Sequence, residues 1–193
     1  DLEAVIAFFT TGYYRTRPDA PWRHRRPNEY GKWVFVKSNL ARLSDPGDRV
    51  LLDEMAWRRR VDGGADIADL AAGLGPEGRS VYDLLVNADP ARVGALIAGL
   101  PDAMRADLMA LDLARHDLSG LSARVILMHG RDDPIIPASQ SVALAAALPP
   151  GQARLFVVGS LAHAELGPGG LFDTYTLWEA IFAVLQWRDG VAD

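Results

Sequence analysis

Apolar residues recur with the period of an amphipathic helix along the first part of the chain. The segment 1–15 begins at Asp1, a residue type that caps helices well, and its apolar residues follow at three- and four-residue steps. The same spacing, interrupted by aspartate, glycine and proline, predicts further helices over residues 29–43, 49–61, 66–74, 77–88, 91–100 and 101–111. The pattern therefore predicts an almost wholly helical unit.

The pattern changes in the last third of the chain. Arg124–Met128 and Ala153–Val158 are short apolar runs with β-branched residues, which is typical of strands buried on both faces of a parallel sheet. Residues 138–148, between them, have the spacing of a helix. We therefore predict an α/β fold in which a helical cap or lid with its connecting segment, 1–118, precedes an α/β part, 119–193.

The chain closes with a predicted helix over residues 171–188. Such a helix would pack across the two strands and support the loop that follows the second one. The apolar side chains expected to face the sheet are Leu171, Tyr175, Trp178, Ile181, Phe182 and Leu185.

Residues with acid–base chemistry follow both predicted strands. Asp132 and Asp133 come after the first strand, and His163 comes after the second. Because the carboxyl ends of parallel strands meet at one edge of a sheet, these side chains can lie close together. A carboxylate beside an imidazole fixes its tautomer and stabilises its cation, as a histidine base in acyl transfer requires. Turn aspartates are also common caps, but the pair on consecutive strand ends favours the chemical interpretation.

The run Gly130–Pro137, followed by His163 after the next strand, resembles the C-terminal part of the α/β-hydrolase fold. The resemblance covers residues 121–188 and implies that Asp133 is the acid of a catalytic triad and His163 its base, in the family's chain order. Asp132 fits less well, because the family's spacing puts the acid one position later. A helical cap inserted before the strand of the acid is also a common feature of this family.

The nucleophile of such a triad is missing. The chain contains no Gly-x-Ser-x-Gly motif and no cysteine. Ser80 has no apolar strand before it and lies in a predicted helix, and Ser160 is better interpreted as a turn residue. We therefore expect the back portion of a serine hydrolase that acts on a carboxylic ester or related acyl bond. The serine and the oxyanion-hole amides would lie on a missing N-terminal part, on the same or an associated chain, and this chain alone would be inactive.

Two other interpretations stay open. A non-catalytic α/β-hydrolase-like binding or scaffolding domain would explain the absent serine without a missing part. A haloalkane or epoxide hydrolase would carry an aspartate nucleophile upstream. The coding sequence before Asp1 would discriminate between the binding domain and the enzymes. The aromatic residues near the start and the large cap favour a small hydrophobic ester as the substrate.

The amino-acid composition excludes several other classes of function. A net charge of −5 argues against nucleic-acid binding, and the absence of cysteine excludes disulfides and thiolate metal sites. We predict no cofactor, no metal site and no membrane span in this segment, and we favour a cytoplasmic location. The proline-rich segment 16–31 carries a cluster of arginines, whose charge is either solvated or attracts an anionic substrate.

Overall fold

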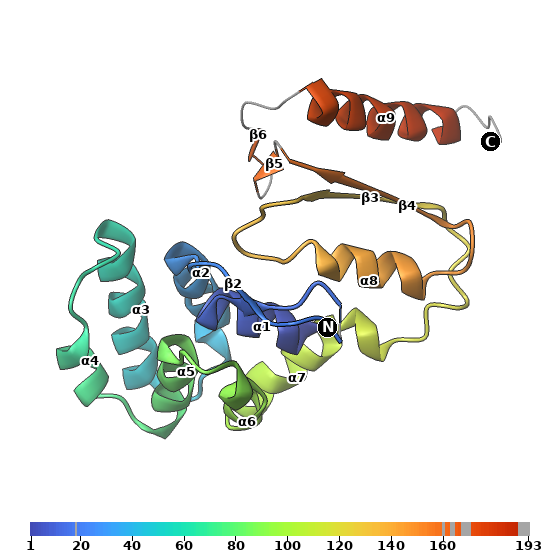
Figure 1. The fold of residues 1–193 in the computed structure, drawn as a ribbon. Helices are drawn as coiled ribbons and strands as arrows, with labels where there is room; N and C mark the ends of the chain where they lie inside the picture. Colours follow the sequence, from blue (N-terminus) through green and yellow to red (C-terminus); the bar gives the residue numbers. More distant parts are fainter. Residues whose placement is uncertain (18, 160, 163–164, 167–170, 189–193) are drawn as a thin grey trace. The chain divides into compact units, whose positions relative to one another are not determined.

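A computed structural model describes residues 1–17, 19–159, 161–162, 165–166 and 171–188 (Figure 1). The contacts within the chain divide it into two compact units. The first, the helical unit, comprises residues 1–14 and 23–113, and the second, the α/β unit, comprises residues 15–22 and 114–193. His163 and Ser160 lie outside the described residues.

The helical unit contains the helices that the apolar spacing predicts, which confirms this part of the prediction. Two short strands, β1 (Tyr13–Tyr14) and β2 (Arg23–His24), form an antiparallel pair that the sequence analysis did not predict. Single 3-10 turns cover Leu40–Arg42, Pro90–Arg92 and Leu113–Arg115. The helices are α1 (Leu2–Thr11), α2 (Glu29–Asn39), α3 (Pro46–Val61), α4 (Ala68–Ala72), α5 (Pro76–Val86), α6 (Val93–Ala98) and α7 (Asp102–Leu111).

Local hydrogen bonds explain where these helices begin and end. The Asp1 side chain accepts a hydrogen bond from Ala4 N at the start of α1, and Asn28 accepts one from Gly31 N at the start of α2. Asp45 caps α3, which has a proline in its first turn. Gly12 ends α1 with a φ of 79°, a left-handed conformation that favours glycine.

The core of the helical unit is large and apolar. It gathers residues from α1 to α7, among them the fully buried Leu52, Met55 and Leu84. The buried carboxylate of Asp48 links two segments of this unit. Asp48 of α3 is 2% exposed, and its side chain accepts hydrogen bonds from Gly75 N and Gly78 N, each at 2.7 Å. Asp48 thus ties α3 to the start of α5.

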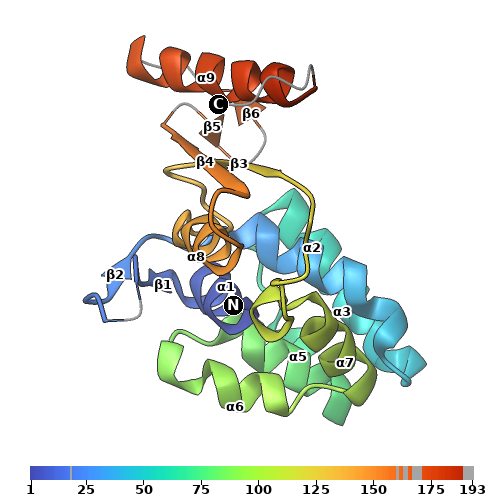
Figure 2. The same ribbon diagram turned by 90° about the vertical axis from the view of Figure 1, so that its right-hand side faces the viewer.

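The α/β unit is built on one parallel strand pair. β3 (Val125–Gly130) and β4 (Ala153–Val158) pair in parallel from Val125↔Ala153 to Gly130↔Val158. α8 (Ser139–Ala147) connects them, and α9 (Leu171–Arg188) follows. Both helices contact the strands, and Figures 1 and 2 show them on opposite faces. This arrangement confirms a mixed α/β class.

A second, short strand pair follows β4. β5 (Leu161–Ala162) and β6 (Glu165–Leu166) are antiparallel, with Ala162 opposite Glu165. β5 also contacts β3. The described helices include none with the length and apolarity needed to cross a bilayer.

The predicted orientation of α9 is wrong. Ala180 and Ala183 are buried and pack with Phe156 of β4, whereas Trp178 and Phe182 are 67% and 58% exposed. The helix carries apolar residues around most of its circumference, so periodicity does not select the face that packs. The small alanines allow the helix backbone to approach the strands closely, and the large side chains are left outside.

A candidate active-site loop after strand β3

The loop that carries Asp133 leaves the sheet at the carboxyl end of β3. Its first residue, Arg131, donates its backbone N–H to the carbonyl of Val158 at 2.8 Å, and Asp133 N donates to the carbonyl of Gly130 at 3.3 Å. Because Gly130 lies opposite Val158 in the parallel register, both strands end at the same level. The segments that follow β3 and β4 therefore start at the same edge of the sheet, where sites of α/β folds form.

The structure distinguishes the two adjacent carboxylates of this loop. Asp133 is 6% exposed, whereas Asp132 is exposed. Oδ1 of Asp133 accepts hydrogen bonds from the backbone N–H groups of Ile135 at 2.7 Å and Ile136 at 2.9 Å. These two bonds form an Asx-type turn that fixes the carboxylate, so the loop presents a buried acid in one orientation.

His129, the penultimate residue of β3, holds this loop in place. Its Nδ1 lies 2.7 Å from Ser141 Oγ of α8, and its Nε2 lies 2.9 Å from the carbonyl oxygen of Ile136. A carbonyl oxygen only accepts hydrogen bonds, so Nε2 carries the proton and donates it. In the neutral ring, Nδ1 then accepts from the Ser141 hydroxyl.

His129 does not replace His163 as the partner of the acid. Its Nε2 lies 3.8 Å from Oδ2 of Asp133, which is too long for a hydrogen bond. Nε2 donates to the carbonyl of Ile136 and Nδ1 lies against the Ser141 hydroxyl, so neither ring nitrogen is hydrogen-bonded to the carboxylate of Asp133. The sequence analysis missed that His129 supports the acid's loop. The sequence feature that could have predicted this role is the position of His129 at the end of a strand, four residues before Asp133.

The predicted base, His163, lies outside the described residues, and its contact with Asp133 stays a prediction. The residues on either side of the undescribed pair 163–164 are Ala162 of β5 and Glu165 of β6, which pair with each other. Figure 1 shows β5 and β6 beside the carboxyl ends of β3 and β4.

One further serine and two further histidines lie outside this loop. Ser80 lies within α5 and its hydroxyl donates to the carbonyl of Glu77 at 2.7 Å, which confirms that it belongs to a helix and not to a nucleophile elbow. His24 is exposed on β2, with its ring 4.7 Å from that of Tyr13. His116 is also exposed. In the part of the chain that the structure describes, no three histidines, aspartates or glutamates are grouped to hold a metal ion.

Comparisons with protein-family models, with curated proteins and with solved structures give no match. The resemblance to α/β hydrolases therefore stays a prediction from the sequence motif.

Proposed function

We propose that this chain supplies the acid and the base of a serine hydrolase of the α/β-hydrolase type, acting on the acyl bond of a small hydrophobic ester. The observation that carries the proposal is the buried carboxylate of Asp133, fixed by two backbone N–H groups at the carboxyl end of a parallel strand. A carboxylate held in this way is suited to orient an imidazole and to stabilise its cation.

The chemistry follows the order of the triad. A serine outside this chain would attack the ester carbonyl carbon while His163 takes the serine proton. His163 would then give that proton to the departing alkoxide, which leaves an acyl-enzyme. A water molecule would then attack the acyl carbon while His163 takes one of its protons. His163 would pass this proton to the departing serine oxygen as the carboxylic acid is released. Asp133 would hold the imidazole throughout, and backbone amides of the absent part would bind the oxyanion.

The proposal requires the remainder of the hydrolase core as a partner, on the same polypeptide or on an associated chain. Among the described residues, β3 pairs with β4 alone, and a two-stranded sheet is marginally stable by itself. Met128 of β3 is 46% exposed, and α9 exposes Trp178 and Phe182. These apolar surfaces would be covered by the further strands and helices that the core of such an enzyme contains.

Fluorophosphonate labelling tests the proposal. The reagent is applied to the polypeptide that includes the sequence encoded upstream of Asp1, and the labelled residue is identified by mass spectrometry. We expect one serine of a Gly-x-Ser-x-Gly motif to be labelled, with the labelling abolished in His163→Ala and strongly reduced in Asp133→Asn. Asp132→Asn is the matched control, since this exposed neighbour should leave the labelling unchanged.

Each alternative gives its own result. Labelling that survives His163→Ala would overturn the assignment of the base. An upstream sequence without a nucleophile, and with no labelling, would favour the binding or scaffolding domain. An upstream aspartate that forms an ester with the substrate would indicate the haloalkane or epoxide hydrolase class.

A further inference from the structure

Residues 15–26, which include the connection between β1 and β2, concentrate positive charge in one short segment. The segment contains five arginines and one aspartate, a net charge of +4. Because the whole chain has a net charge of −5, the remaining residues together carry −9. Arg25 is half-buried, and the other four arginines are exposed. A negatively charged surface would therefore attract this chain through this segment.

Backbone pairing holds the two ends of the segment together. β1 and β2 pair antiparallel with Tyr13 opposite His24, and Arg25 N donates to the carbonyl of Gly12 at 2.9 Å. In Figure 2, β1 and β2 extend to one side, beyond the helices of the helical unit. The arginines at and after β2 are thus carried by a paired backbone, which lowers the entropy that is lost when they bind.

An exposed tryptophan lies among these charges. Trp22 is 49% exposed, and the guanidinium carbon of Arg15 lies 4.2 Å from the centroid of its ring. This cation–π contact joins an apolar ring to a charged group, and such amphipathic side chains are enriched where a bilayer meets water. Tyr30, four residues after Arg26, is 63% exposed. Exposed aromatic rings therefore accompany the arginines along the chain.

The arrangement of the aromatic rings favours a lipid surface over a nucleic acid. Single-stranded nucleic acids bind such basic segments by stacking their bases on aromatic faces. Here Arg15 covers one face of Trp22, and the rings of Tyr13 and His24 lie 4.7 Å apart. Binding to a bilayer needs no open ring face, because guanidinium groups contact the lipid phosphates while an exposed ring enters the headgroup layer.

We propose that residues 15–26 bind the surface of a bilayer that contains anionic phospholipids, with the arginines at the lipid phosphates and Trp22 in the headgroup layer. Clusters of about four to eight basic residues are typical of such sites, and each basic residue near the surface raises the affinity about fivefold. This inference is independent of the proposed hydrolase activity.

Co-sedimentation of the chain with vesicles tests the proposal. One set of vesicles contains phosphatidylcholine alone, and the other contains one third phosphatidylserine. We expect binding to the second set to be at least about tenfold tighter, because only these vesicles carry net negative charge. Raising NaCl from about 0.1 M to about 1 M should remove this difference, since the Debye length falls from about 10 Å to about 3 Å.

Two double variants separate the segment from the net charge of the chain. Arg23→Gln combined with Arg26→Gln should weaken binding to the anionic vesicles about thirtyfold. The matched control is Arg60→Gln combined with Arg92→Gln, which changes the net charge equally at two exposed arginines outside the segment. The control should leave the affinity within about twofold. Far-UV circular dichroism checks that both variants keep the helical content of the native chain.

Fluorescence quenching by brominated phosphatidylcholine in the anionic vesicles reports which tryptophan enters the lipid. The chain has five tryptophans, and the difference between the native chain and Trp22→Phe isolates the signal of Trp22. At saturating vesicle concentration we expect quenching of the native chain and little quenching of Trp22→Phe, although the variant still sediments with the vesicles.

Several results would overturn the inference. Equal binding to the two sets of vesicles, or an equal loss of affinity in the two double variants, would exclude recognition by this segment. Quenching that survives Trp22→Phe would show that a different surface meets the lipid. Displacement from the vesicles by soluble phosphoserine would indicate a site for one free headgroup, and tighter binding to a single-stranded oligonucleotide than to the vesicles would indicate a nucleic-acid site.

Discussion

Replacing the buried carboxylate of Asp48 should destabilise the helical unit more than any exposed charge change in it. Asp48 accepts two backbone hydrogen bonds of 2.7 Å, from Gly75 and Gly78, while 2% of the residue is exposed. In Asp48→Ala both N–H groups lose their acceptor. Hydrogen bonds to charged groups contribute about 1.5–3 kcal/mol each, so we expect a loss of about 3–6 kcal/mol in the free energy of unfolding. The whole free energy of unfolding of a small domain is only about 5–15 kcal/mol.

Asp48→Asn refines the test, because asparagine has the same shape with only one acceptor oxygen. Its amide NH₂ would face one of the two backbone donors, and we expect a loss of about 2 kcal/mol. The matched control is Asp53→Asn on the same helix, where the carboxylate pairs with Lys37 on the surface and should contribute about 0.5 kcal/mol. Urea unfolding followed by far-UV circular dichroism measures all three. Equal midpoints for the variants at 48 and 53 would refute the reasoning.

Three further predictions concern other contacts. Gly12→Ala should destabilise by more than the 1 kcal/mol or so that a left-handed φ costs, because the added Cβ would lie 2.0 Å from the carbonyl oxygen of Arg25; an unchanged melting temperature would contradict this. Hydrogen bonds from Ser44 lower the pKa of Glu77 below 4.5, and the bond from the Ser44 hydroxyl has a larger effect than the bond from its backbone N–H. This carboxylate therefore stabilises the fold above that value and loses its contribution as the pH falls through the lowered pKa, so the difference in urea midpoint between the native chain and Glu77→Gln should disappear in acid. Trp178→Ser should reduce self-association in sedimentation without loss of helical circular dichroism, because this side chain is 67% exposed; a loss of helix would show instead that the side chain is needed for folding.

The helices could be predicted because their signals are local. Asp1 precedes apolar spacing and does cap α1, as predicted, whereas α3 begins at Pro46 and not at residue 49 because Asp45 caps it. The helix predicted over 66–74 is shorter in the structure, since the Asp66 side chain accepts a hydrogen bond from Ala68 N and so stands outside α4. Gly73 follows the last helical residue. The helices are thus predicted in number and order, while their ends differ from the prediction where a capping residue or a 3-10 turn ends the α-helix.

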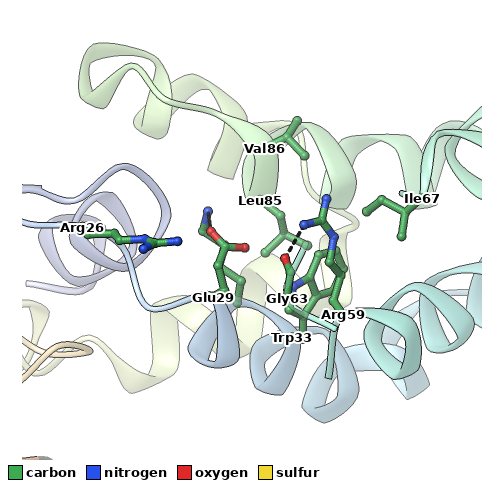
Figure 3. A pocket seen from close by; sticks show the side chains of 9 residues that line it. Arg26, Glu29, Trp33, Arg59, Gly63, Ile67, Leu85 and Val86 are labelled. Atoms are coloured by element: carbon green, nitrogen blue, oxygen red, sulfur yellow. Dashed lines mark hydrogen bonds and ion pairs between the residues drawn. The ribbon is translucent and has the colours of Figure 1, made fainter. Parts of the chain in front are cut away.

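The contacts that join distant segments could not be predicted. The hydrogen bonds of Asp48 join residues 27 and 30 positions apart in the chain, and no pattern in the sequence predicts them. The pocket lined by Trp33, Arg59 and Leu85 is likewise assembled from α2, α3 and α5 (Figure 3). Arg26 of the arginine-rich segment 16–31 also lines it. Its position opposite Arg59 depends on tertiary packing.

The two units differ in how well they bury their own apolar residues, and this difference bears on the proposed chemistry. The helical unit closes around a core drawn from all its helices. Among the residues whose side chains the structure describes, the buried cluster between β4 and α9 consists of Phe156, Ala180 and Ala183, with Ile126 packed beside it. Larger side chains of α9 remain exposed. Hydrophobic burial is the main favourable term in folding, so the α/β unit has more to gain from additional polypeptide. The proposed function predicts that the strand bearing the nucleophile packs against this unit, which holds Asp133, and covers part of its exposed apolar surface.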